Sequence, residues 1–414
     1  MIKIVADKDI PFLKGVFEPY SLIEYYNGKE INSDIIKNAD ILLIRTRTKC
    51  NASLLEGSKV KLIATATIGT DHIDLDFCNS NGIKIINAPG CNSGGVMQYV
   101  FTAIFNIAVS HSVWHNEVSA TAVSTNDATA NAVPANAALT NIAPANAVFT
   151  NAVPANDDQP TANESNAANL FQPINKTKIG VIGVGHVGSK VANLAEYLGF
   201  EVLRNDPPKE IEQTLAFNNG YLTLDDFVDY YSIEYILENA DIITMHVPLN
   251  DSTFKMASDS FFSKIKKGAI FINSSRGEVV DESALLRYMD NFYTVIDVWN
   301  NEPNINLEIL KRATIATPHI AGYSLEGKIN GTQMAVRGIA DNFSELEALK
   351  NFVVTEVSPN PNILNLKQLS LNEIASTLLK IFPIIDLDKK LRENSSSFEQ
   401  IRNNYNYRRE FYVK

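Results

Sequence analysis

The sequence predicts an α/β fold with two doubly wound lobes around a cleft and a C-terminal segment after them. Short apolar runs alternate with stretches of helical periodicity over residues 1–89 and again over residues 178–316, as in parallel sheets with crossover helices. A glycine-rich turn at residues 183–188 links one of these runs to an amphipathic stretch. The chain has 414 residues, 45% of them hydrophobic and 20% charged, which is enough for two or three globular domains.

The glycine-rich turn lies between an apolar strand, Ile179–Ile182, and a helix. A second strand, Phe200–Leu203, follows the helix and leads to Asp206. Glycines at this spacing allow a tight turn, the approach of a pyrophosphate to the backbone, and close packing of the helix on the strand: Gly183, Gly185 and Gly188. The alternative is an ordinary βαβ crossover. We interpret the stretch as a Rossmann-type dinucleotide site, because strand, turn, helix and acid occur together, and we count Val187 among its cofactor contacts.

Asp206 indicates which dinucleotide binds. It stands about 20 residues after the glycines, where a carboxylate accepts hydrogen bonds from the adenosine ribose and repels a 2′-phosphate. Arg204 lies close enough to weaken this preference a little. NAD is therefore the predicted cofactor.

Composition excludes several classes of function. The net charge of −11 disfavours broad attraction to nucleic acid or to an anionic membrane, and no apolar stretch is long enough to span a bilayer. The three cysteines are odd in number and form no CxxC pair, which suits a reducing compartment and predicts a cytoplasmic protein. His111 and His115 have the spacing of a metal pair, but no third ligand accompanies them, so no metal site is predicted.

The N-terminal part reads as a small α/β lobe. Its expected strands are Ile2–Ala6, Asp40–Arg45, Lys61–Ala66 and Ile83–Ile86, and residues 32–39 are expected to be helical. Polar residues follow two of these strands, at 46–49 and at 67–72. Because ligands of open α/β sheets bind at the carboxyl ends of strands, these residues are candidates for substrate binding. The alternative is that they are plain turn residues.

Two segments stand outside the alternating pattern. A tract rich in Ala, Asn, Pro and Thr, at about residues 117–169, repeats every ten residues and carries prolines that would break a helix. We expect a disordered insertion there. The tail from about residue 347 includes an apolar periodic helix at Leu371–Phe382, which would need a partner surface.

Three polar residues follow apolar strands in the second half of the chain. Arg276 comes after AIFIN, Glu302 after TVIDV, and His319 after a short strand at 314–316. An arginine can bind a carboxylate bidentately, a histidine can move a hydroxyl proton, and a glutamate can orient its ring. Each one alone could be a surface, turn or capping residue. Together, after a dinucleotide fold, they predict oxidation of a 2-hydroxy acid.

The sequence resembles the D-isomer-specific 2-hydroxyacid dehydrogenases. The matching stretches are GVIGVGHVGSKVA, INSSRGEVVDESAL, IDVWNNEP and TPHIAGYSLEGK, in the order of that family. The resemblance implies a substrate lobe at residues 1–93, completed by part of 320–345, and a NAD-binding domain at 94–319 that contains the insertion. Residues 347–414 would form a dimerisation domain, and the protein would be a homodimer.

The resemblance also implies roles for single residues. The catalytic residues would be Arg276, Glu302 and His319, with His319 transferring the proton. Asp206, Asp297 and Gly322 would contact the cofactor. Thr46, Thr67 and Tyr323 would contact the substrate.

Within the family, IRTRTK, ATATIGTDHID, APGCN and the tail FEQIRNNYNYRREF point to members that oxidise 4-phospho-D-erythronate to 2-oxo-3-hydroxy-4-phosphobutanoate in pyridoxal 5′-phosphate (vitamin B6) biosynthesis. The alternatives are a phosphoglycerate dehydrogenase or hydroxypyruvate reductase, and a non-catalytic protein that senses NAD(H). A phosphorylated substrate needs a second cationic anchor besides Arg276. Arg45, Arg47 and Lys49 surround the Thr46 turn, and which of them contacts the phosphate stays open.

Overall fold

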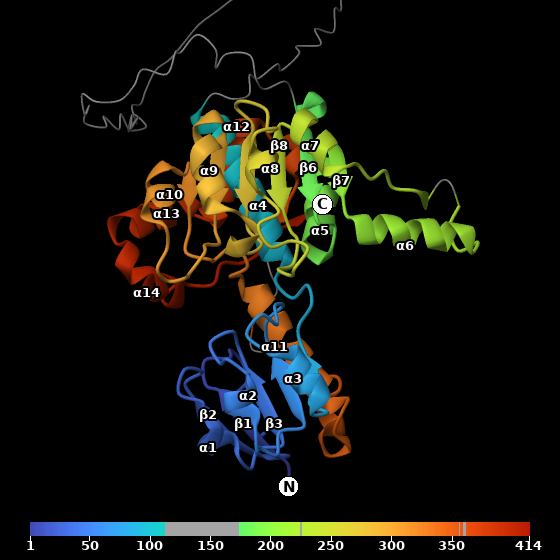
Figure 1. Ribbon diagram of the computed structural model, residues 1–414, viewed down its shortest axis with the longest axis vertical. Helices are drawn as coiled ribbons and strands as arrows, with labels where there is room; N and C mark the ends of the chain where they lie inside the picture. Colours follow the sequence, from blue (N-terminus) through green and yellow to red (C-terminus); the bar gives the residue numbers. More distant parts are fainter. Residues whose placement is uncertain (112–173, 224–225, 356, 359–361) are drawn as a thin grey trace, which may run out of the picture.

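The computed structural model describes residues 1–111, 174–223, 226–355, 357–358 and 362–414. The predicted insertion at residues 117–169 lies outside this range, and so does His115. The described chain forms a smaller N-terminal lobe and a larger lobe, with the C-terminal helices packed on the larger one (Figure 1). This is the predicted α/β architecture with two parallel sheets.

The smaller lobe is built on a five-stranded parallel sheet in the order β2-β1-β3-β4-β5. Its strands are β1 (Lys3–Asp7), β2 (Leu22–Tyr26), β3 (Ile41–Ile44), β4 (Leu62–Thr65) and β5 (Lys84–Ile86). The two central strands β3 and β4 are buried along their whole length, which explains their continuous apolar sequences. The edge strand β2 was not predicted. Its residues, LIEYY, are exposed or half-buried, so they form no apolar run.

Short helices cover this sheet, each begun by an Asn or Asp side chain that accepts backbone N–H bonds: α1 (Ser33–Ile36), α2 (Ala52–Leu55) and α3 (Leu75–Ser80). The helix expected over residues 32–39 is therefore only one turn long. The long helix α11 (Leu325–Ala340) comes from much later in the chain and packs against β4 and β5.

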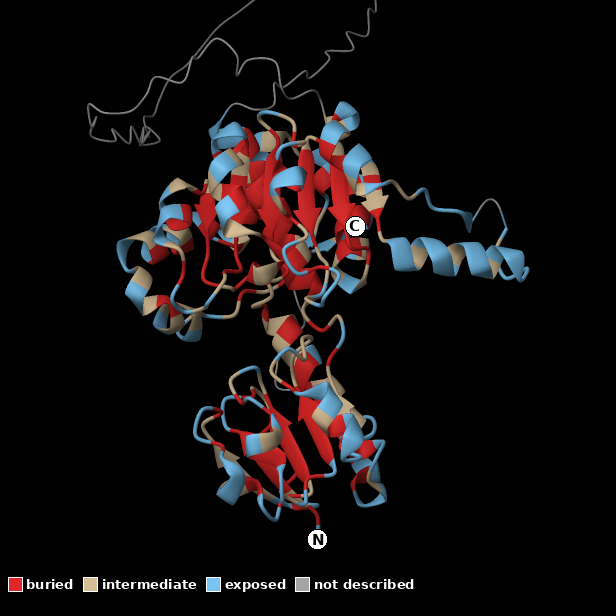
Figure 2. Ribbon diagram, in the orientation of Figure 1, coloured by how far each residue is buried: buried red, intermediate tan, exposed pale blue. Residues whose placement is uncertain are grey.

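The larger lobe is built on a six-stranded parallel sheet in the order β11-β10-β9-β8-β6-β7. Its strands are β6 (Lys178–Ile182), β7 (Glu201–Asn205), β8 (Ile242–Met245), β9 (Ile270–Asn273), β10 (Tyr293–Ile296) and β11 (Ile315–Ala316). Each predicted strand of this half is present. Figure 2 shows the sheet as the buried centre of the lobe, as expected for apolar strands covered on both faces.

Helices surround this sheet: α4 (Ser93–Ser110), α5 (His186–Leu198), α6 (Pro207–Asn218), α7 (Ile233–Asn239), α8 (Asp259–Phe262), α9 (Glu282–Tyr288) and α10 (Leu307–Arg312). Single 3₁₀ turns accompany them: η2 (Ile174–Lys176), η4 (Gly277–Val279) and η5 (Met289–Asn291). Helix α4 is buried over most of its length and packs on α5. Helix α6 extends away from the lobe (Figure 1). No helix of the described chain is long and apolar enough to cross a membrane.

The C-terminal segment packs on the larger lobe of its own chain. It comprises α12 (Leu371–Ile381), α13 (Ile384–Glu393), α14 (Phe398–Asn403), the parallel pair β12 (Ile363–Leu364) and β13 (Tyr412–Val413), and the turns η7 (Leu366–Gln368) and η8 (Ser395–Ser397). The preceding 3₁₀ stretch η6 (Ser344–Leu349) packs instead on α11, in the core of the smaller lobe. The apolar face of α12 lies against α4, where Leu378 and Phe382 are fully buried. The surface that this face needs is therefore α4 of the same chain, so the face gives no argument for a second subunit, and the dimerisation role of the segment stays a prediction.

Candidate functional site

The glycine-rich turn has the geometry that a pyrophosphate site requires. Gly183 has φ +86°, and a Cβ there would lie 2.8 Å from the backbone carbon of His246, so only glycine fits. A Cβ on Gly188 would overlap the carbonyl of Gly183, which makes the close approach of α5 to β6 dependent on glycine. Gly185 instead faces open space at the start of the 13-residue α5. A phosphate can approach the backbone there, at the positive end of the helix.

Asp206 follows β7 and is fixed by backbone hydrogen bonds. Its Oδ2 accepts from the N–H of Val184 at 2.7 Å, and its Oδ1 accepts from the N–H of Lys209 at 3.2 Å. A carboxylate has about four acceptor positions, so ribose hydroxyls can still bind it. Arg204 pairs with Glu196 at 2.5 Å, so its charge already has an acidic partner. These residues fit NAD, whereas Val187 is a half-buried residue packed on the core of the lobe.

His319 and Glu302 form a pair at the end of the larger sheet. Nδ1 of His319 lies 2.9 Å from both carboxylate oxygens of Glu302. Glu302 also accepts from the N–H of Trp299 at 3.1 Å and from Nη1 of Arg402 at 3.2 Å. Burial raises the pKa of Glu302, but the charge and hydrogen bond of His319 and the charge of Arg402 outweigh it, so the pKa lies below its ordinary value. The carboxylate is therefore ionised at neutral pH, and it holds the proton of the ring on Nδ1.

The loop that carries His319 is held in an unusual backbone conformation. His319 has φ +55°, a region that non-glycine residues rarely adopt. The buried carboxylate of Asp297 fixes this loop, since it accepts from the N–H groups of Ile320 and Ala321 at 2.8 and 2.9 Å and from the hydroxyl of Thr317 at 2.7 Å. Burial raises the pKa of Asp297, and these bonds oppose the rise. Asp297 thus positions the histidine in the described structure. Gly322 continues the loop against Asn92, where a Cβ would overlap the Asn92 side chain.

Arg276 extends from the end of β9 to the smaller lobe. Its Nε donates to Oδ2 of Asp71 at 2.9 Å, and its Nη1 donates to the carbonyl of Ser275 at 2.8 Å. The guanidinium lies directly over Gly69. Thr67 belongs to the same loop, and its hydroxyl donates to the carbonyl of Gly69 at 3.5 Å. The structure therefore brings Arg276 and Thr67 to one place, across the two lobes.

Tyr323 is linked to the histidine pair through Arg402, which bonds both Tyr323 and Glu302, and two residues that the sequence did not single out contact this tyrosine. Its hydroxyl accepts from Nε of Arg402 at 2.8 Å, and Nζ of Lys328 lies 3.9 Å from its ring centre. Arg402 comes from α14 and Lys328 from α11. The stretches HIAGYSLEGK and FEQIRNNYNYRREF contain both residues, but nothing in their spacing predicts that they meet.

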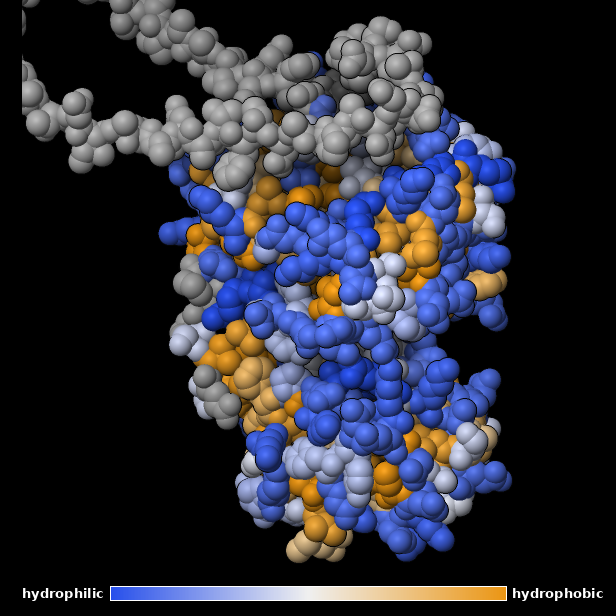
Figure 3. Space-filling view, turned by 90° about the vertical axis from the view of Figure 1, so that its left-hand side faces the viewer, coloured by the Kyte–Doolittle hydropathy of each residue, from blue (hydrophilic) through white to orange (hydrophobic). Residues whose placement is uncertain are grey.

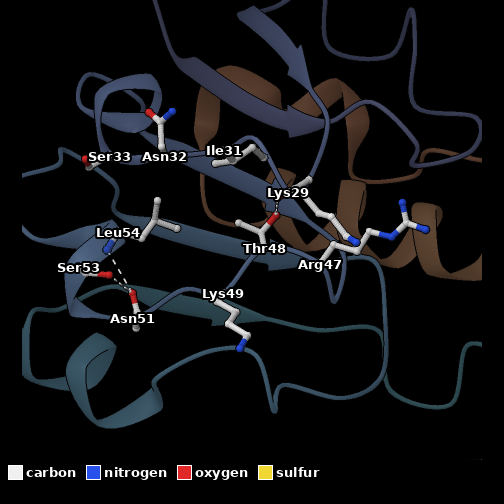
Figure 4. A pocket seen from close by; sticks show the side chains of 11 residues that line it. Lys29, Ile31, Asn32, Ser33, Arg47, Thr48, Lys49, Asn51, Ser53 and Leu54 are labelled. Carbon is white, nitrogen blue, oxygen red and sulfur yellow. Dashed lines mark hydrogen bonds between the residues drawn. The ribbon is translucent and has the colours of Figure 1, made fainter. Parts of the chain in front are cut away.

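The cations around Thr46 have different environments. Arg45 pairs with Asp7 and Asp9, each at 3.0 Å, and Arg47 lies 3.6 Å from Asp9 and donates to Asn403 of α14. Lys49 is exposed and lines an open pocket on the smaller lobe, as does Arg47 (Figure 4). Thr46 itself is exposed, and the structure gives it no contact with the other candidates. Figure 3 shows mainly hydrophilic side chains on the two lobes where they face each other.

The chain is similar to known proteins over nearly its whole length. Residues 142–321 match the model of the D-isomer specific 2-hydroxyacid dehydrogenase, NAD binding domain. The chain is 36% identical to the erythronate-4-phosphate dehydrogenase of Bacteroides thetaiotaomicron, over 99% of this chain and 97% of that protein. It is 32% identical to the enzyme of the same name from Porphyromonas gingivalis, over 99% of this chain and 94% of that protein.

Solved structures share the fold. The D-lactate dehydrogenase of Aquifex aeolicus, solved with NAD and lactic acid, has a TM-score of 0.58 at 23% identity and covers 86% of this chain and 100% of its own. The 3-phosphoglycerate dehydrogenase of Entamoeba histolytica, solved with NAD⁺, has a TM-score of 0.56 at 22% identity and covers 86% and 99%.

Proposed function

Since the chain belongs to the erythronate-4-phosphate dehydrogenase family, within the D-isomer specific 2-hydroxyacid dehydrogenases, we propose that it oxidises 4-phospho-D-erythronate to 2-oxo-3-hydroxy-4-phosphobutanoate with NAD⁺. Such a step serves pyridoxal 5′-phosphate biosynthesis. The structural observation that carries the proposal is the His319–Glu302 pair at 2.9 Å, on the same lobe as a glycine turn that fits NAD. A protein that only senses NAD(H) would not need this pair.

The proposed mechanism follows from the hydrogen bonds of His319. Its Nδ1 proton is held by Glu302, so Nε2 is left as the acceptor for the C2 hydroxyl proton of the substrate. As the hydroxyl loses its proton, the C2–O bond becomes a carbonyl and the C2 hydrogen leaves as a hydride. Bound NAD⁺ supplies the hydride acceptor. Glu302 stabilises the imidazolium that forms, and its low pKa keeps it ionised while it does so.

Arg276 is proposed to bind the substrate carboxylate. In the described structure its Nε donates to Oδ2 of Asp71, and a substrate carboxylate can replace that partner. An arginine can bind such a carboxylate bidentately. Thr67 stands in the same loop and can add a neutral hydrogen bond. We assign substrate binding to residues 1–93 with part of 320–345 and NAD binding to residues 94–319, and we take Thr46 as a further substrate contact from the family resemblance alone.

A substrate panel tests the proposal. Purified protein with NAD⁺ should form NADH fastest with 4-phosphoerythronate, and His319→Ala should reduce kcat by roughly 10²–10⁴. Faster turnover of 3-phosphoglycerate would favour a phosphoglycerate dehydrogenase. NAD binding without turnover of any 2-hydroxy acid would favour a sensor.

The cytoplasmic location and the homodimer are part of the proposal. All three cysteines are free, buried thiols, as suits a reducing compartment. The apolar face of α12 gives no argument for a dimer, because α4 of the same chain covers it. Removal of the C-terminal segment would expose the core around α4. Helix α6 does expose apolar side chains, namely Ile211, Leu215 and Phe217. Light scattering of the full chain should give twice the monomer mass, and a monomer would contradict the proposal.

A further inference from the structure

The cations near Tyr323 are not balanced by acids. Four cations stand in this region: Arg45, Arg47, Lys328 and Arg402. Its acids are already engaged, because Asp7 and Asp9 pair with the two arginines of the smaller lobe and Glu302 pairs with His319 and Arg402. No acid in the described part of the chain pairs with Lys328. Among the described residues its Nζ contacts only aromatic faces, at 3.9 Å from the ring centre of Tyr323 and 5.3 Å from that of Tyr407.

Arg402 also has unused donors. Its Nε donates to Tyr323 and its Nη1 to Glu302, while its Nη2 has no acceptor in the part of the chain that the structure describes. A guanidinium carries five N–H donors, and these two bonds use two of them, so three remain for a further acceptor. Both Lys328 and Arg402 contact the same tyrosine, one at its ring and one at its hydroxyl. The remaining N–H donors of Lys328 and Arg402 therefore lie near the same tyrosine side chain, Tyr323.

The pKa values in this region agree with an excess of positive charge. Burial raises the pKa of Tyr323, but Lys328, Arg402 and Arg45 outweigh this effect and bring it below its ordinary value. Burial lowers the pKa of Lys328, and the repulsion of Arg45 and Arg402 adds to that, against the opposing effects of Tyr323 and Cys91. An uncompensated cation in a buried place is costly, and a bound anion removes the cost.

We propose that Lys328 of α11 and Arg402 of α14, with the hydroxyl of Tyr323, bind the phosphate end of the substrate. This assignment rests on the proposed function. Arg276 is proposed to bind the carboxylate end of the substrate, so the phosphate end needs other cations. Arg402 bonds Glu302, and Glu302 bonds His319, so Arg402 lies next to the proton-transfer pair. A phosphate dianion matches the pair of donors better than a neutral hydroxyl does, because hydrogen bonds between charged groups are the stronger ones. Lys49, which is exposed on the open pocket, is not part of this anchor.

The test compares Lys328→Met with Lys328→Arg, in the full chain loaded with NAD⁺. Lys328→Met should raise the KM for 4-phosphoerythronate about 10- to 100-fold and leave kcat/KM for unphosphorylated erythronate within about twofold, as expected for the loss of one charged hydrogen bond. Lys328→Arg should retain most of the affinity. Lys380→Met, which removes an exposed lysine of α12, is the matched control for the loss of one charge. Melting temperatures show that each variant is folded.

Calorimetric titration with inorganic phosphate separates this proposal from the proposed function. Phosphate should bind the unmodified protein and the Lys380→Met variant equally, and the Lys328→Met variant at least about tenfold more weakly. If phosphate binds in this pattern but 4-phosphoerythronate is not oxidised, the function is wrong and the anion site stands. The site assignment is overturned if Lys328→Met binds phosphate normally, if both substrates weaken equally, or if Lys49→Met alone produces the loss.

Discussion

The substitution Gly69→Ala should impair substrate binding and leave the fold intact. A Cβ at this position would overlap Nη2 of Arg276 and would lie 2.7 Å from Oδ2 of Asp71 and 3.3 Å from Cζ of Arg276. The φ of Gly69 lies outside the left-handed region, so its backbone accepts alanine. The guanidinium is the far end of a flexible side chain and will move before the backbone does.

The size of the effect follows from these distances. Non-bonded heavy atoms separate by about 3.5–4.0 Å, so the guanidinium must move by about 1 Å or more. That displacement breaks the 2.9 Å bond to Asp71 and moves the donors away from the carboxylate that replaces it. Loss of a charged hydrogen bond costs roughly 1.5–3 kcal/mol, which is about a 10- to 150-fold decrease in kcat/KM. Stability should change little, because the Arg276–Asp71 pair is 29% and 42% exposed and such pairs contribute about 0–1 kcal/mol.

A double-mutant cycle tests whether Gly69→Ala acts through Arg276. We expect Gly69→Ala and Arg276→Ala each to lower kcat/KM for 4-phosphoerythronate, measured as NADH formation, and the double variant to be no worse than Arg276→Ala alone. The reason is that removal of the guanidinium leaves the new methyl group nothing to displace. If the two effects add, or if Gly69→Ala retains full activity, the placement of Arg276 over Gly69 is not the one that binds substrate.

Three further results are expected. Glu302→Gln should lower kcat about 10- to 100-fold, since the imidazolium loses a charged partner, whereas Glu282→Gln, which removes a charge that bonds Asn306 at 3.0 Å, should not. The unmodified enzyme should prefer NAD to NADP by at least about tenfold in kcat/KM, or about 1.4 kcal/mol, and equal rates would contradict the role of Asp206. Burial lowers the pKa of His246 to about 3, so the unfolded chain takes up the proton first. The contribution of His246 to the free energy of unfolding is complete above the ordinary pKa of 6.5 and falls by about 1.4 kcal/mol per pH unit as the pH drops toward 3. Urea unfolding at several pH values should therefore show a steeper loss of stability for the unmodified protein than for His246→Gln.

The strands were predictable because most of them are buried on both faces. β8 and β9 are buried along their whole length and mostly apolar, and such a short apolar run between turn signals is read directly from the sequence. β2 escaped prediction for the opposite reason, since it lies at the edge of the sheet and keeps Glu24 and its tyrosines half-exposed. The helix expected at residues 32–39 ended after one turn, although Asn32 does cap it.

The placement of the candidate residues was predictable where they follow strands, and it was not predictable where the contact comes from a distant part of the chain. Arg276, Glu302 and His319 each follow a strand of the larger sheet, so the topology carries them to one edge. Arg402 is 79 positions from Tyr323 and 100 from Glu302, and no local pattern encodes those contacts. The apolar helix α12 had a clear periodicity, but periodicity states only that a face is covered and not by what. Here α4 of the same chain covers it.

The position of Arg402 gives a physical reason why the C-terminal segment belongs to the site. The carboxylate of Glu302 faces Nδ1 of His319 at 2.9 Å and also accepts a hydrogen bond from Nη1 of Arg402 at 3.2 Å. Arg402 is one of the charges that hold the pKa of Glu302 below its ordinary value, so a residue of α14 helps to keep the partner of the histidine ionised. The same arginine would meet the phosphate of the substrate under the proposal above. Arg402 would then contact both the phosphate end and the partner of the proton-transfer histidine, so one side chain of α14 links the two parts of the site.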